Sequence, residues 1–159
     1  MSKETERGAR GKALALLAGR DYTEKKLTEK LAQKGFSPEA CGDALQYVKS
    51  YGYVSDDRYA DRYIELRRNS MSRKQIRMEL TEKRGVPAGI AEAALERAGE
   101  WDEKPLIRKL ADKKLKGKDI GDSGFRKKMT AAFLRKGFLY GDIREVLGNI
   151  PEDGETAEW

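Results

Sequence analysis

The 159-residue sequence contains no histidine and only one cysteine, Cys41, and these shortages exclude several kinds of site. Histidine is the usual general base near neutral pH and the commonest metal ligand, so catalysis loses its first candidates. A single cysteine cannot form an internal disulfide, which fits a reducing cytoplasm. The sequence also has no phosphate-binding loop, dinucleotide-binding glycine turn or paired metal-ligand motif. We therefore expect no enzyme activity, no metal and no cofactor.

Long apolar runs are missing as well. The longest one, Ala13 to Ala18, is far shorter than the roughly 20 residues that a membrane-spanning helix needs, and charged residues follow it at once. No stretch alternates apolar and polar residues with an enrichment in β-branched side chains, so no strand is expected. These absences predict a soluble, cytoplasmic, helical protein that does not enter a membrane.

What the sequence does contain is a pattern that occurs three times: a glycine followed by apolar residues six, nine, ten and thirteen positions later. The three glycines are Gly35, Gly85 and Gly137, which are 50 and 52 residues apart. The apolar positions form the stripe of a helix with one buried face, so each glycine is interpreted as the break before that helix. A fixed period of this size is typical of tandem structural units.

Two further amphipathic segments precede each glycine. The nearer one carries an apolar pair, and the three pairs are Leu27 with Leu31, Ile76 with Leu80, and Met129 with Phe133. The outer pairs lie eight and four residues before their glycine, whereas the middle pair lies nine and five before, which predicts one extra residue near Gly85. The farther segments are expected at residues 12–19, 56–68 and 103–116.

The sequence thus predicts nine helices in an all-α fold: three tandem three-helix repeats in an elongated, curved array. The repeats are expected at residues 1–52, 53–100 and 101–150, followed by an acidic tail at 151–159. Capping residues support these limits, because a serine or proline stands at several expected helix starts. They are Ser37 with Pro38, Ser55, Ser72, Pro87 and Ser123. The longest connection, at 117–124, is expected to let the first helix of the third repeat swing.

Aromatic and acidic residues leave two questions open. Tyr47, Tyr51 and Tyr53, and also Trp101, either tie neighbouring repeats together or pack inside their own repeats. Three aspartates near the start of the fourth helix either hold a magnesium ion or simply favour the helix N-terminus. These aspartates are Asp56, Asp57 and Asp61. The second interpretation is preferred, with Arg58 and Arg62 as ion-pair partners.

Basic residues exceed acidic ones by 33 to 27, and their distribution is uneven. Two segments, 67–77 and 126–136, contain no acid, and three lysines form a stripe on the helix between them. These residues are either a solvated face or a surface that binds phosphate groups or an acidic protein. The candidate binding residues are Arg67, Arg68, Arg73, Lys74, Arg77, Lys109, Lys113, Lys116, Arg126, Lys127 and Lys128.

Several segments resemble the RecX family of bacterial recombinase regulators. The run from Gly52 to Ala60, followed by residues 76–80 and 83–86, is similar to the central motif of that family. Residues 27–36 and 133–138 are similar to its flanking repeats. The resemblance covers about residues 12 to 150, in the same order of elements.

The resemblance implies an all-helical, non-catalytic protein that binds the RecA recombinase filament on single-stranded DNA. Such a protein restrains the ATPase, strand-exchange and co-protease activities of RecA. DNA is contacted directly or through the filament, and the protein is expected to be monomeric. Two other hypotheses stay open: a stand-alone DNA-binding protein whose second and third helices act as a helix-turn-helix, and a purely structural scaffold.

Overall fold

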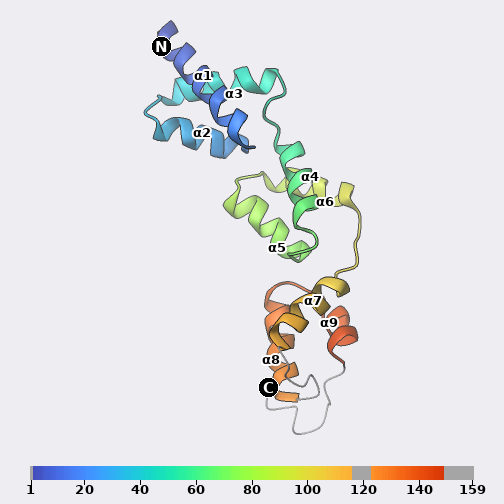
Figure 1. Cartoon of the computed structure of the whole chain (residues 1–159). Coiled ribbons are helices and arrows are strands. Elements are labelled where there is room, and N and C mark those ends of the chain that lie inside the picture. The colour runs from blue at the N-terminus through green and yellow to red at the C-terminus, as the bar shows by residue number, and fades with distance from the viewer. Residues whose placement is uncertain (1, 116–122, 149–159) are drawn as a thin grey trace. The chain divides into compact units, whose positions relative to one another are not determined.

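A computed structural model describes residues 2–115 and 123–148. In these ranges the chain forms nine α-helices and one π-helical segment, and it has no strand (Figure 1). The expected all-α class is therefore confirmed. The helices are α1 (Lys3–Gly19), α2 (Glu24–Gln33), α3 (Pro38–Ser50), α4 (Asp56–Arg67), α5 (Arg73–Met78), the π-helix η1 (Glu79–Lys83), α6 (Ala88–Ala98), α7 (Lys104–Leu115), α8 (Ser123–Arg135) and α9 (Tyr140–Leu147).

The described residues form two compact units. The first unit comprises residues 2–65 and 77–99, and the second comprises residues 66–76, 100–115 and 123–148. The chain passes from one unit to the other inside α4 and again inside α5, so each of these helices contributes to both. Each unit is described by itself below.

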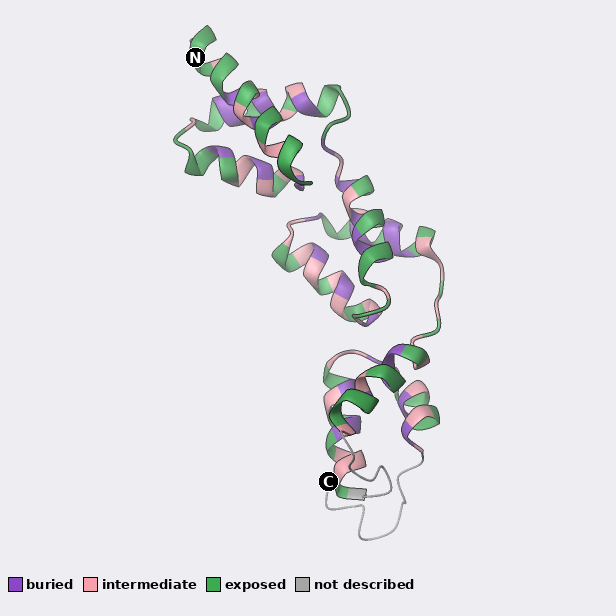
Figure 2. Cartoon of the chain, in the orientation of Figure 1, coloured by how far each residue is buried: buried purple, intermediate pink, exposed green. Residues whose placement is uncertain are grey.

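Helices α1 to α3 enclose one apolar core, and α7 to α9 enclose another. The first core contains Leu27, Leu31 and Val48, all fully buried, and the second is built around Phe133 and Ile143. Buried and exposed residues alternate along the helices, as the amphipathic patterns predict (Figure 2). Burying each large aliphatic side chain contributes roughly 1.5–3 kcal/mol before chain entropy is subtracted.

The three glycines end helices as expected. Gly35, Gly85 and Gly137 have φ angles of +96°, +77° and +94°, a left-handed conformation that favours glycine. The amide after the first glycine donates to the carbonyl of Leu31, five residues earlier, at 3.3 Å. The amide after the third donates to Phe133, again five residues earlier, at 3.1 Å. These bonds close the helix ends in the manner of a Schellman motif.

The extra residue expected near Gly85 is accommodated by η1. Here the amide of Val86 donates to the carbonyl of Leu80, six residues earlier rather than five, at 2.8 Å. A π-helical turn takes one more residue than an α-helical turn, so it absorbs an insertion without moving the flanking apolar residues off their face. The prediction from the spacing is confirmed, and its physical form is a π-helix.

Helix α1 begins earlier than expected. The expectation of a helix from residue 12 is wrong at its N-terminal end, because α1 begins at Lys3. The Ser2 side chain accepts a bond from the Thr5 amide at 3.1 Å, and two glutamates occupy the first turn. The apolar periodicity missed this part because only Ala9 and Ala13 of α1 are buried. The 117–124 connection and the 151–159 tail lie largely or wholly outside the described residues.

Candidate functional site

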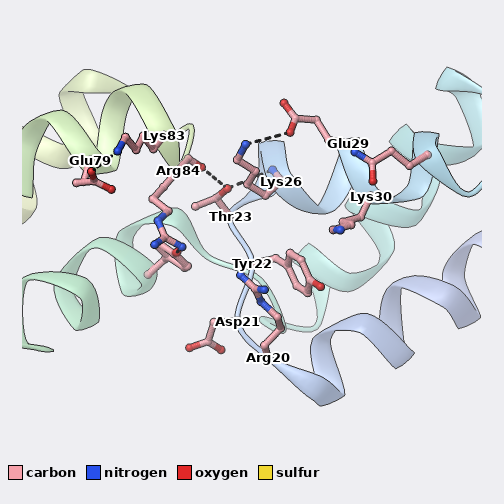
Figure 3. A pocket seen from close by; sticks show the side chains of 12 residues that line it. Arg20, Asp21, Tyr22, Thr23, Lys26, Glu29, Lys30, Glu79, Lys83 and Arg84 are labelled. Atoms are coloured by element: carbon pink, nitrogen blue, oxygen red, sulfur yellow. Dashed lines mark hydrogen bonds and ion pairs between the residues drawn. The ribbon is translucent and has the colours of Figure 1, made fainter.

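A recurring contact joins the N-terminus of one helix to a glycine corner much later in the chain. In the first unit, the Thr23 hydroxyl donates to the carbonyl of Arg84 at 2.6 Å (Figure 3). The next amide, of Glu24, donates to a carboxylate oxygen of Asp56 at 2.9 Å. We call this set of contacts, with Lys25 and the adjacent glycine at position 85, the first junction. It ties α2 to the start of α4 and to the end of η1.

The second unit contains the same arrangement. The Ser72 hydroxyl donates to the carbonyl of Lys136 at 2.5 Å, and the amide of Arg73 donates to Glu103 at 3.3 Å. We call this set, with Lys74 and Gly137, the second junction. Each junction therefore uses a hydroxyl N-cap, the following amide, an acid at the start of a later helix, and a glycine corner.

The glycines at both junctions are closely covered by lysine stems. A Cβ atom added to Gly85 would lie 2.6 Å from Lys25 Cδ, and one added to Gly137 would lie 2.5 Å from Lys74 Cβ. By contrast, a Cβ on Gly35 would meet nothing within 4 Å. Thus Gly35 is needed for its backbone conformation alone. Gly85 and Gly137 are needed also because a lysine stem approaches each of them closely.

Both junction acids are shielded from water, Asp56 almost completely and Glu103 in part. Asp56 is only 5% exposed, and burial raises the pKa of its carboxyl group above the ordinary value, although the Glu24 amide opposes this rise. Burial likewise raises the pKa of the Glu103 carboxyl group. One oxygen of Glu103 has no hydrogen-bond partner among the residues that the structure describes. The junctions therefore hold carboxyl groups whose charged form is disfavoured.

The aromatic residues answer the question left open by the sequence. Trp101 does tie separate segments of the second unit together, because Arg68 and Arg73 lie over its ring at 5.1 and 4.9 Å. The tyrosines behave differently: Tyr51 and Tyr53 stack on each other at 5.6 Å and remain 60% and 52% exposed. Of the two alternatives left open for these tyrosines, their mutual stacking agrees with local packing.

The candidate basic residues fall into several places. In the second unit, Arg68 and Arg73 stack on Trp101 and Lys74 covers Gly137, so these three have structural roles at the second junction. Arg77 lies one turn after Arg73 in α5, and in the first unit it pairs with Glu92. Lys116 lies outside the described residues.

The remaining candidates lie on the surface to different degrees. Those that are exposed are Arg67, Lys109, Lys113 and Lys128, and those that are half-buried are Arg126 and Lys127. The two exposed lysines of α7 lie one turn apart on one face, as the sequence predicted. A role of these residues in binding stays a prediction.

No cluster of three potential metal ligands occurs among residues 2–115 and 123–148, and two of the three aspartates of α4 have protein partners instead. Asp56 accepts the Glu24 amide, and Asp61 pairs with Arg97 at 2.9 Å. The expected pairing with Arg58 and Arg62 is wrong. Arg62 instead pairs with Asp21 at 2.9 Å, and Arg58 donates to the carbonyl of Gly52 at 2.9 Å.

Beside the first junction lies an open hollow of about 340 Å³ that the sequence analysis missed (Figure 3). Its walls come from the connection after α1, from α2, from Tyr59 of α4, and from η1 with the residue that follows it. Arg20 and Arg84, which face it, are 64 positions apart in the sequence, so a search for runs of basic residues could not pair them.

No helix in the described ranges is long and apolar enough to cross a membrane.

Comparison with known proteins gives matches to two domain models of a single family. Residues 9–47 match the model of the first three-helix domain of RecX, and residues 55–95 match that of the second. The fold is similar to a crystal structure of RecX from Lactobacillus salivarius, with a TM-score of 0.77, 22% identity and coverage of 92% of this chain and 96% of that one.

Curated relatives agree. A regulatory protein RecX from Trichlorobacter lovleyi is 35% identical over 84% of this chain and 90% of its own length. Another, from Caldanaerobacter subterraneus, is 42% identical over 67% of this chain, which spans only 54% of that protein. One from Chlorobium limicola is 29% identical and is aligned over 99% of both chains. The chain therefore belongs to the RecX family of regulatory proteins.

Proposed function

We propose that this chain is a non-catalytic regulator that binds the RecA filament on single-stranded DNA. Bound there, it restrains the ATP hydrolysis, strand exchange and co-protease activity of RecA. It thereby acts in DNA repair, recombination and the SOS response, and it does so in the cytoplasm. The observation that carries the proposal is the match of two successive segments to the first and second three-helix domains of RecX. Relatives that are 42% and 35% identical to this chain are named as regulatory proteins.

We also propose that α7 to α9 form a third repeat and that the three repeats make an elongated, curved array. Two features support the third repeat: the glycine corner after α8 has the same closing bond as the one after α2, and the second junction has the same parts as the first. An array with basic residues on several repeats can contact more than one protomer of a filament as a monomer. Such distributed contacts raise the apparent affinity through effective concentration.

A titration tests the proposal. The purified chain is added to RecA on single-stranded DNA, and the rate of ATP hydrolysis is recorded at each concentration. We expect a saturable fall in the rate while the chain itself hydrolyses no ATP. An unchanged rate at all concentrations would remove the proposed function. Tight binding to naked DNA together with an unchanged rate would favour the stand-alone DNA-binding protein instead.

A further inference from the structure

We propose that the hollow beside the first junction is a binding site for phosphate oxyanions. The phosphate would come from a free phosphate compound or from the backbone of a single-stranded nucleic acid. The site lies wholly in the first unit. It goes beyond the proposed function because phosphate binding in the hollow does not require the RecA filament, so it can be tested without a recombinase.

The charge of the walls supports an anionic ligand. Five basic and three acidic residues line the hollow, which leaves an excess of two positive charges. The acids are already neutralised: Glu29 pairs with Lys26 at 3.3 Å, and Glu79 pairs with Lys83 at 2.9 Å. The third acid, Asp21, pairs with an arginine that does not line the hollow. Three cations therefore remain without a carboxylate partner among the described residues, namely Arg20, Lys30 and Arg84.

The two arginines are held in place by aromatic rings rather than by acids. Arg20 lies over the ring of Tyr22 at 5.0 Å, and Arg84 lies over the ring of Tyr63 at 5.4 Å and donates one N–H to the Tyr59 hydroxyl at 3.4 Å. A guanidinium group over a ring keeps N–H donors on its edge, and those donors suit the oxygens of a phosphate. The arrangement therefore fixes the position of the two cations without using up their charge.

Three uncompensated cations favour phosphate over a carboxylate side chain. A carboxylate carries one charge and two oxygens in a plane, whereas a phosphate group directs its oxygens tetrahedrally and carries one charge in a diester and up to two in a terminal or free phosphate. The three cations come from three separate segments, namely the connection after α1, helix α2 and the end of η1. A tetrahedral ligand can accept from all three at once. Binding would therefore also link these segments across the first junction.

The test is calorimetric titration of the full chain with two phosphate probes. Pyrophosphate represents a free phosphate compound, and an oligothymidylate without terminal phosphates represents the nucleic-acid backbone. Binding of either probe is expected, and the one that binds identifies the source of the phosphate. If both bind, they are expected to compete. Binding of neither probe would overturn the proposal, as would tighter binding of poly-L-glutamate, which would indicate an acidic protein segment instead.

Matched variants locate the site. Arg20→Gln with Arg84→Gln should weaken phosphate binding by about tenfold or more, because two charge-assisted contacts are lost. The control, Arg7→Gln with Arg108→Gln, makes the same change in net charge at two exposed arginines elsewhere and should weaken it by less than about twofold. Equal losses in the two double variants would overturn the assignment.

A measurement on the unaltered chain keeps the test independent of whether the variants fold. Addition of pyrophosphate should shift the backbone amide NMR signals around Tyr22, Lys30 and Arg84. Shifts confined to other parts of the chain would show that phosphate binds elsewhere and would also overturn the proposal.

Discussion

Two aspartates of the first unit are in opposite electrostatic environments. Asp56 is buried at the first junction, where burial raises the pKa of its carboxyl group. Asp43 receives two bonds from the Arg10 guanidinium, at 2.9 and 3.0 Å, and these bonds lower the pKa of its carboxyl group. Because a shifted pKa makes stability depend on pH, the two residues should contribute to stability with opposite signs.

For Asp56, the contribution to stability is fully present below the ordinary pKa of 3.8 and is lost as pH rises through its raised value in the folded state. For Asp43, the contribution is present above 3.8 and is lost as pH falls through its lowered value. Asp56→Asn should therefore gain stability relative to the unaltered chain as pH rises from 3 to 7, whereas Asp43→Asn should lose it. Urea denaturation across this range measures both differences. Parallel trends in the two variants would contradict the assigned environments.

At the scale of elements, the glycine corners show two reasons for glycine: its left-handed backbone conformation and its lack of a side chain. All three corners need a left-handed backbone, but only Gly85 and Gly137 must also admit a lysine stem from another segment. The corner at Gly35 thus provides a built-in control for conformational strain alone.

Substitution of each glycine by alanine should measure the cost of backbone strain and the cost of the close contact with lysine. Gly35→Ala should lower the free energy of unfolding by about 1–2 kcal/mol, the cost of a left-handed non-glycine residue. Gly85→Ala and Gly137→Ala should cost about 1–3 kcal/mol more, because of overpacking.

Adding Lys25→Ala should recover part of the loss at Gly85, since the closest atom there is Lys25 Cδ. Adding Lys74→Ala should recover little at Gly137, where Lys74 Cβ itself is closest. Equal losses at all three glycines would contradict the close approach.

The π-helix makes a second prediction at this scale. Deletion of the exposed Glu82 should convert η1 into a regular helical turn and give Gly85 the spacing found at the other two corners. The chain should stay folded with nearly unchanged stability. Deletion of the exposed Ala32, at the matching place in α2, should shift Leu31 relative to Gly35 and cost at least about 3 kcal/mol. Thermal unfolding followed by circular dichroism measures both, and equal damage would contradict the role given to η1.

At the scale of the whole molecule, the structure changes which basic residues are suitable for testing binding. Arg68, Arg73 and Lys74 take part in the second junction, so changing them alters the fold as well as the charge. Lys109 and Lys113 are exposed on α7 and make no ion pair among the described residues. They therefore separate binding from stability.

Charge reversal at these two lysines should weaken inhibition of the RecA ATPase by about threefold to tenfold, because repulsion replaces attraction toward an acidic or phosphate surface. Thermal stability should be unchanged. The control is Lys12→Glu with Lys3→Glu, which makes the same charge change on α1. Equal inhibition by both double variants and the unaltered chain would remove Lys109 and Lys113 from the binding surface.

Much of the fold could be predicted because its signals are local. Apolar stripes, capping residues and the glycine corners lie within short windows, and even the extra residue of η1 was visible as a change in spacing. The junctions could not be found this way, since Thr23 and Arg84 are 61 residues apart and meet through a hydroxyl and a carbonyl. The hollow was missed for the same reason. The basic runs were visible, but the sequence could not show that Arg68 and Arg73 are held by Trp101.

The central proposal is that this chain binds the RecA filament on single-stranded DNA, and it predicts a preference for the assembled filament over its two components. The most direct measurement is equilibrium binding of the labelled chain to three targets at one salt concentration: RecA assembled on single-stranded DNA, RecA alone, and the DNA alone. We predict that the assembled filament binds at least about tenfold more tightly than either component, because it offers several protomers to one array. Equal or tighter binding to the bare DNA would contradict the claim.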